Sequence, residues 1–167
     1  MITIISGTNR KDSNTSKVAE LYRRLLGDKG VAVSLLSLEG LDVSARTPAI
    51  EQLEKDVLLK TERFIFIAPE YNGSIPGVLK SLIDNTDVKK IWGGKKALLT
   101  GVSTGRAGNL RGMEHLTGIL QYVKMHVHHN KLPISVVDKL LNGTSTITDK
   151  TTLQAIDEQL TEFLDWK

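Results

Sequence analysis

The sequence contains no cysteine, and this absence excludes several kinds of chemistry at once. Without cysteine there is no disulfide bond, no cysteine nucleophile and no iron–sulfur cluster held by thiolates. No apolar run approaches the roughly 20 residues that cross a bilayer. The chain also enters a strand-like segment directly, with no basic leader before it. These observations predict a cytoplasmic protein that makes no use of a membrane.

The sequence also lacks a large excess of charge of either sign. The 22 lysines and arginines exceed the 19 aspartates and glutamates by only three. So small an excess suits an anionic ligand, but it does not indicate a nucleic-acid partner, and ordinary variation in surface charge explains it equally well. The 40% of hydrophobic and 25% of charged residues are typical of a globular chain, and the length predicts a single domain over residues 1–167.

Short β-branched runs alternate with longer segments of helical period. Strands are expected at residues 2–5, 31–36, 64–68, 96–101 and 125–130, the last more polar and so at an edge. Helices are expected from about residues 13, 48, 76, 110 and 151. This alternation predicts an α/β fold, a parallel sheet with helices on both faces. Ligands of such sheets bind beyond the carboxyl ends of the strands, which directs attention to the loops after the first, third and fourth strands.

The first of these loops, SGTNRKDSNTS at residues 6–16, has the chemistry of a phosphate-binding turn, although it lacks the dinucleotide and P-loop fingerprints. Gly7 permits a tight turn, and Arg10 offers a planar guanidinium to phosphate oxygens. Hydroxyl groups come from Thr8, Ser13 and Thr15. The following helix directs unpaired N–H groups at the same place. Ser13 and Asn14 would also cap that helix, but the arginine and the strand–turn–helix context favour phosphate binding.

The second loop, PEYNGSIPG at residues 69–77, holds two of the four prolines of the chain and two glycines, so it is stiff. Tyr71 offers a flat apolar face, and Asn72 can form hydrogen bonds to the edge of a heterocycle. Composition alone favours a structural role instead, in which Tyr71 covers the core and Glu70 is solvated.

The third loop, GVSTGRAGNLRG at residues 101–112, contains four glycines that allow backbone N–H groups to come close to a ligand. A long surface turn with Arg106 and Arg111 in solvent explains its composition equally well.

Three segments, in this order, resemble stretches of the NADPH-dependent FMN reductase family: GTNRKDSNTSKVA, PEYNGSIPGVLKSLIDN and VSTGRAG. The second, at residues 69–85, is the most distinctive and resembles the family almost residue for residue. The resemblance covers the chain to about residue 132. It implies a flavodoxin-like three-layer sandwich with five parallel strands in the order 2-1-3-4-5, and FMN bound without a covalent link.

The resemblance also assigns roles to residues by position. The phosphate would be held by Thr8, Arg10, Ser13, Asn14 and Thr15. The isoalloxazine would be bordered by Pro69, Glu70, Tyr71, Asn72 and Gly73. Its polar edge would face Ser103, Thr104 and Gly105. A homodimer or homotetramer is implied, with residues 69–77 near a subunit contact.

The implied activity is hydride transfer from NAD(P)H to FMN, followed by reduction of a quinone, an azo compound, a free flavin or a metal oxyanion. One pocket that serves both substrates in turn predicts ping-pong kinetics. The flavin carries the chemistry, so no side chain is predicted to be catalytic. Two alternatives remain: a non-enzymatic electron carrier of flavodoxin type, against which the positive net charge argues, and a redox-sensing module gated by the flavin.

The histidines in MHVHH, at residues 125–129, raise the possibility of a metal site. On a strand, His126 and His128 would share one face. Two imidazoles without a carboxylate nearby in the sequence make a poor site, so no metal is predicted. Trp92 and Trp166 are expected to be packing or interface residues rather than stacking partners of a ligand.

Overall fold

The computed structural model describes residues 1–167. The strands are β1 (Ile2–Ser6), β2 (Val33–Ser37), β3 (Arg63–Pro69), β4 (Lys96–Val102), β5 (His126–Val127) and β6 (Leu132–Ile134). The helices are α1 (Asn14–Asp28), α2 (Pro48–Leu53), the π-helical turn η1 (Glu54–Leu58), α3 (Gly77–Asp84), α4 (Val88–Ile91), α5 (Leu110–Tyr122), α6 (Val137–Leu141) and α7 (Lys150–Asp165). No helix combines the length and the apolar character that a membrane span needs.

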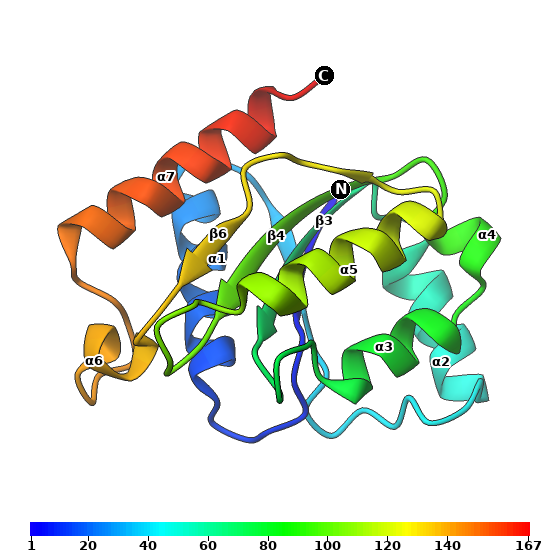
Figure 1. Ribbon diagram of the computed structural model, residues 1–167. Coiled ribbons are helices and arrows are strands. Elements are labelled where there is room, and N and C mark those ends of the chain that lie inside the picture. Colours follow the sequence, from blue (N-terminus) through cyan, green and yellow to red (C-terminus); the bar gives the residue numbers. More distant parts are fainter.

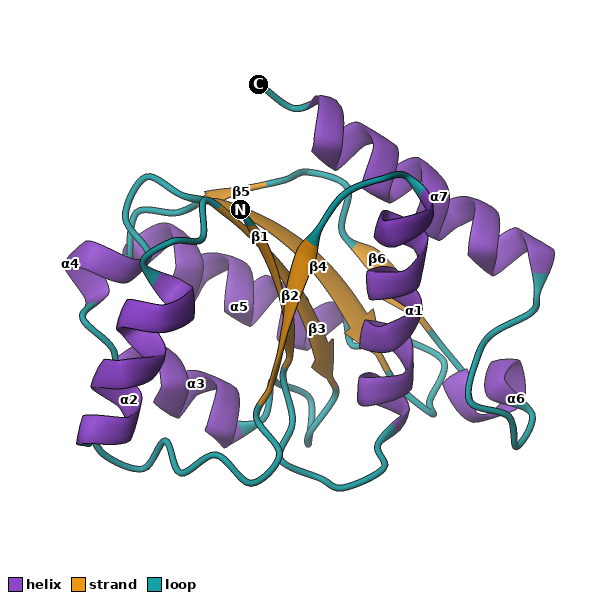
Figure 2. Ribbon diagram, turned by 180° about the vertical axis from the view of Figure 1, so that it is seen from behind, coloured by secondary structure: helices purple, strands orange, loops and turns teal.

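The strands form one parallel sheet in the order β2-β1-β3-β4-β5, and β6 adds to β4. Figures 1 and 2 show α1, α6 and α7 on one side of this sheet and α2 to α5 on the other. The flavodoxin-like three-layer prediction is therefore confirmed, and the sheet has one short strand more than expected.

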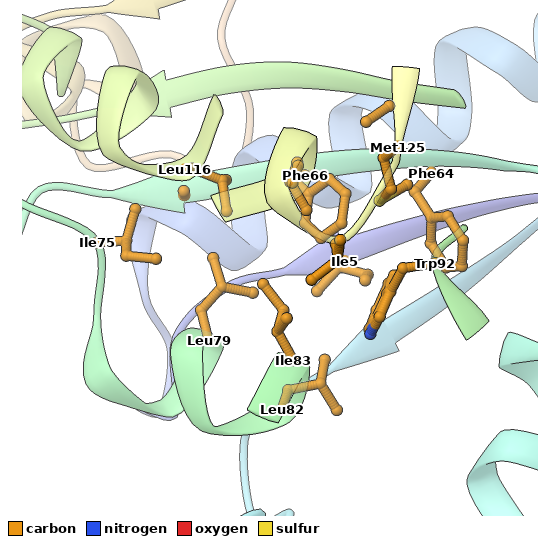
Figure 3. Close-up of a cluster of buried hydrophobic side chains, with 14 of the residues drawn as sticks. Ile5, Phe64, Phe66, Ile75, Leu79, Leu82, Ile83, Trp92, Leu116 and Met125 are labelled. Atoms are coloured by element: carbon orange, nitrogen blue, oxygen red, sulfur yellow. The ribbon is translucent and has the colours of Figure 1, made fainter. Parts of the chain in front are cut away.

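Two apolar clusters separate the layers, because alternate side chains of each strand point to opposite faces of the sheet. Ile5, Phe64 and Phe66 belong to the cluster under α3 and α5, where Trp92 packs against both phenylalanine rings (Figure 3). Ile4 and Ile65 belong to the cluster under α1 and α7. The sheet is thus buried on both faces, as the predicted parallel sheet with helices on both sides requires.

The edge strand differs from its prediction. A single strand was expected over residues 125–130, but β5 pairs only with Lys96 and Ala97 at the start of β4, whereas β6 pairs with residues 100–102 at its end. The connection between the two short strands turns out of the sheet, with the amide of Lys131 donating to the carbonyl of His129 (3.0 Å). Pro133 lies in β6, where an edge position tolerates the missing N–H donor.

One close approach in the sheet gives a stability prediction. A Cβ on Gly101, in β4, would lie 2.0 Å from the carbonyl oxygen of Gly108, whereas one on Gly118, in α5, meets nothing within 4 Å. We expect Gly101→Ala to lower the free energy of unfolding by about 1–3 kcal/mol through overpacking against the backbone. The matched Gly118→Ala should raise it by about 0.5–1 kcal/mol, because alanine is the better helix former. Urea denaturation of both variants measures these changes. If the free energy of unfolding of Gly101→Ala equals that of the wild type, the close packing at Gly101 is contradicted.

Candidate functional site

The three loops leave the same edge of the sheet, and the backbone ladder continues into each of them. The amide of Gly7 donates to the carbonyl of Ile67 (2.9 Å), and that of Glu70 to the carbonyl of Val102 (2.9 Å). The amide of Ser103 donates to the carbonyl of Ile134 in β6 (3.0 Å). Each loop is therefore held to its neighbouring strand at the point where it departs, and the three loops converge.

The first loop presents the amino end of α1 to this convergence. Ser13 is the N-cap, and its hydroxyl accepts a hydrogen bond from the amide of Ser16 (3.0 Å). The amides of Asn14 and Thr15 belong to the first turn, where N–H groups have no partner within a helix. They and the helix dipole therefore favour an anion at this point. The prediction that Ser13 caps the helix is confirmed, and this role already uses its hydroxyl oxygen as an acceptor.

The second loop forms a tight hairpin. The backbone groups of Tyr71 and Ser74 pair with each other (2.9 and 3.1 Å), and both central residues have positive φ, 52° at Asn72 and 79° at Gly73. This is the turn that the Asn–Gly sequence favours, because both residues adopt left-handed backbone at low cost. It places Asn72 and Gly73 at the tip.

Tyr71 connects the second loop to the first. Its hydroxyl forms a hydrogen bond with the hydroxyl of Thr8 (2.7 Å), and the guanidinium of Arg10 lies 4.3 Å from the centre of its ring. Thr8 is buried and also accepts a hydrogen bond from the backbone amide of Arg10 (3.2 Å). The tyrosine thus contacts Thr8 and Arg10, two of the five residues that are predicted to hold the phosphate.

The third loop is held from the segment after β6. The carbonyl of Gly105 accepts hydrogen bonds from the hydroxyl of Ser103 (2.9 Å) and from the amide of Val136 (3.0 Å). The amide of Val137 donates to the carbonyl of Ser103 (3.0 Å). Val136 has a φ of 45°, a strained conformation for a β-branched residue. Further along, the side-chain amide of Asn109 donates to the carbonyl of Ala68 (2.9 Å), which ties this loop to the end of β3.

The loops enclose a cavity of about 330 Å³, within the range of about 300–1,000 Å³ of small-molecule sites. The predicted residues that line it are Thr8, Arg10, Ser13, Asn14, Thr15, Pro69, Glu70, Tyr71, Ser103 and Thr104. Three predicted residues do not line it. Asn72 and Gly73 form the hairpin tip, and Gly105 uses its carbonyl to hold the loop.

Four residues line the cavity that the sequence reasoning did not name: Lys11, Asp12, Val102 and Val137. Lys11 and Asp12 lie inside the first loop, and Val102 ends β4, so their positions beside the named residues were a usable signal. Val137 had none, because nothing in the sequence after residue 132 indicates that α6 returns to the third loop.

The sequence matches known proteins over the region that builds this cavity. The family model for NADPH-dependent FMN reductase matches residues 1–136. An NAD(P)H-dependent FMN reductase of Pseudomonas aeruginosa is 28% identical over an alignment 172 residues long, which covers 97% of this chain and 92% of that protein. A 2-hydroxy-1,4-benzoquinone reductase of a Burkholderia species is 26% identical over 145 residues, which cover 78% of this chain and 79% of that protein.

A solved structure has the same fold along the whole chain. FerB, a flavoenzyme NAD(P)H:(acceptor) oxidoreductase from Paracoccus denitrificans, superposes with a TM-score of 0.81 at 24% identity, and the match covers 99% of this chain and 95% of that one. Taken with the family match, the strand order and the three converging loops, this identifies the chain as a member of the NADPH-dependent FMN reductase family, an oxidoreductase that uses FMN with NAD(P)H as the electron donor.

Proposed function

We propose that this chain reduces quinones with electrons from NAD(P)H, using FMN held in the cavity between its three loops. The observation that supports this most is that ten of the residues predicted to bind FMN line one cavity. Quinone is the preferred acceptor because relatives of this chain are named quinone reductases. Azo compounds, free flavins and metal oxyanions are alternative acceptors.

The anionic end of FMN fits the amino end of α1. Arg10 and Lys11 supply positive charge at the cavity, Thr8 and Thr15 supply hydroxyls, and the first-turn amides of Asn14 and Thr15 supply backbone donors. No acidic residue occupies the first turn of α1, so nothing there repels a phosphate. Asp12 is exposed at the start of the turn, where it is solvated.

The ring of FMN fits the remaining wall. Tyr71, Val102 and Val137 supply apolar surface, and Ser103 and Thr104 supply polar groups. When bound, FMN accepts hydride from NAD(P)H and gives electrons to the acceptor. The chain contributes position and electrostatics, because the flavin carries the redox chemistry. We therefore assign no side chain a catalytic role.

The two substrates would use this cavity in turn, which leads to ping-pong kinetics. Mixing the FMN-loaded protein with NADPH without air should bleach the flavin within the enzyme's turnover time, and adding a quinone should restore the colour. Initial rates at several quinone concentrations should give parallel double-reciprocal lines. A flavin that stays oxidised with both NADPH and NADH would instead favour an electron carrier of flavodoxin type. Intersecting lines would reject the ping-pong order and leave the proposed quinone reduction standing.

The proposed phosphate site leads to a prediction for Arg10→Ala. Removing a charge-assisted hydrogen bond costs about 1.5–3 kcal/mol, so FMN affinity should fall about ten- to a hundredfold. Riboflavin lacks the phosphate, and its affinity should fall much less. Titration of the apoprotein by flavin fluorescence measures both constants.

Arg10→Ala also removes the contact between the guanidinium and the ring of Tyr71, and it does so whichever flavin is bound. The riboflavin affinity therefore measures the effect of losing that contact, and the additional loss for FMN measures the phosphate interaction. Arg111→Ala is the matched control for charge, since Arg111 is exposed and does not line the cavity. Equal losses for FMN and riboflavin would mean that Arg10 does not contact the phosphate.

We also propose that the active form is a homodimer or homotetramer in which a second copy covers the groove between α3 and α5. This groove, of about 780 Å³, is lined by Ile75, Val88, Ile119 and Tyr122 among others, and Tyr122 is 87% exposed. The groove adjoins the second loop through Ser74, whose hydroxyl pairs with Nδ1 of His115 (2.9 Å). Exposed apolar surface of this kind is typical of interfaces.

Tyr122→Asp should shift the oligomer toward the monomer, because the contact would then have to desolvate a charge. Light scattering of the FMN-loaded protein at several concentrations measures the shift. Leu59→Asp, at an exposed position outside the groove, is the control and should leave the mass unchanged. A monomeric wild type would contradict the proposal directly.

A further inference from the structure

A cluster of two histidines and one glutamate lies at the opposite end of the sheet from the cavity. His128 and His129 follow β5, and Glu162 comes from the last turns of α7. One donor atom from each lies within 4.8 Å of the others. The amide of His128 donates to the carbonyl of Ala97, at the start of β4 (2.8 Å), whereas the cavity lies beyond the end of that strand. Figure 2 shows β5 at the end of the sheet opposite the start of α1.

His128 is held in place by packing. Its side chain is buried, and its ring meets those of Phe163 and Trp166 edge-on, with centroids 6.0 and 5.1 Å away. The amide of Asn130 donates to Nδ1 (3.2 Å), so this nitrogen carries a lone pair and the proton lies on Nε2. A cation at Nδ1 would take the place of that N–H group.

Glu162 is held by a neighbour, and His129 is free to turn. The side-chain amide of Asn130 donates to Oε2 of Glu162 (2.9 Å), and Nε2 of His129 lies 3.8 Å from the same oxygen. The ring of His129 stacks on that of His128, with centroids 4.4 Å apart, and its side chain is 86% exposed. The nitrogen lone pairs of an imidazole lie in the plane of its ring, so those of two stacked rings do not point at one common position. A shared cation therefore requires His129 to rotate. Because the side chain of His129 is 86% exposed, the packing contact that opposes this rotation is its stacking on His128.

We propose that His128, His129 and Glu162 bind one divalent transition-metal cation of the zinc type, with water completing the coordination. Two imidazoles and one carboxylate suit Zn²⁺, Ni²⁺ or Cu²⁺, whereas Mg²⁺ and Ca²⁺ prefer oxygen ligands alone. The site would cross-link α7 to the segment between β5 and β6.

The site differs from the one that the spacing of the histidines suggests. The ladder to β4 continues through both His126 and His128, but His126 is exposed and the groups near His128 are His129 and Glu162 instead. The carboxylate is supplied from 34 residues further along the chain, in α7, where no local sequence pattern indicates it.

The test is a calorimetric titration of the FMN-loaded protein with ZnCl₂ at pH 7, with thermal melting followed in parallel. We expect one saturable zinc site per chain and a Tm that rises with zinc concentration, because the cation binds only the folded arrangement. MgCl₂ should produce neither effect. His129→Ala and Glu162→Gln should each weaken zinc binding at least about tenfold, and Asn130→Ala, which removes the support of Glu162, about 10- to 100-fold.

His126→Ala is the matched control, since His126 is an exposed histidine two residues from the cluster that belongs to no candidate site. It should bind zinc like the wild type. The proposal is overturned if no saturable zinc binding occurs, if MgCl₂ acts like ZnCl₂, or if His129→Ala and Glu162→Gln bind zinc as the wild type does. Both substitutions are at exposed positions, and an unchanged flavin spectrum in each variant shows that the fold is intact.

Discussion

The parallel register of β1, β3 and β4 is the constraint on which the candidate site depends. Because the three strands run in one direction and are paired residue by residue, their carboxyl ends meet at one edge. The backbone ladder then continues by one hydrogen bond into each loop, at Gly7, Glu70 and Ser103. Segments almost a hundred residues apart are thereby brought to one cavity before any side chain of the loops has made a contact.

Side chains then connect the loops to one another. Tyr71 reaches Thr8 and Arg10 in the first loop, and Asn109 reaches the carbonyl of Ala68 before the second. Asn109 itself is fully buried with a φ of 64°, and its Oδ1 has no hydrogen-bond partner. An unpaired buried acceptor is costly, which indicates that the side chain is placed for its bond to Ala68. Preorganisation of this kind is what a protein supplies when its cofactor carries the chemistry.

The resemblance to the family was sufficient to predict the order of the main strands. The residues themselves predicted the cap of the first helix at Ser13, and most of the cavity lining was predicted as well. Apolar runs and loop motifs are local features, and the sheet converts their order into proximity. The failures are all non-local. The division of the edge strand into β5 and β6 depends on how each pairs with β4. The position of Val137 in the cavity lining depends on α6, which no recognisable sequence motif announces. Asn72 and Gly73 form the tip of the second loop and do not line this cavity, so their contact with the isoalloxazine stays a prediction.

The position of α7 explains why the two ends of the sheet can carry separate chemistry. Gln159 is fully buried in this helix, and its side-chain amide donates to the carbonyls of Leu99 (3.0 Å) and Asn130 (2.9 Å). Its oxygen accepts from the hydroxyl of Tyr22 (2.7 Å), which reaches across from α1. Leaving any of these buried polar groups without its partner would cost free energy. The network therefore fixes α7 to β4 and α1 independently of any cation. The proposed histidine and glutamate ligands therefore lie on elements that are already docked, so a cation there would require the rotation of His129 and the loss of the hydrogen bond from the Asn130 amide to Nδ1 of His128.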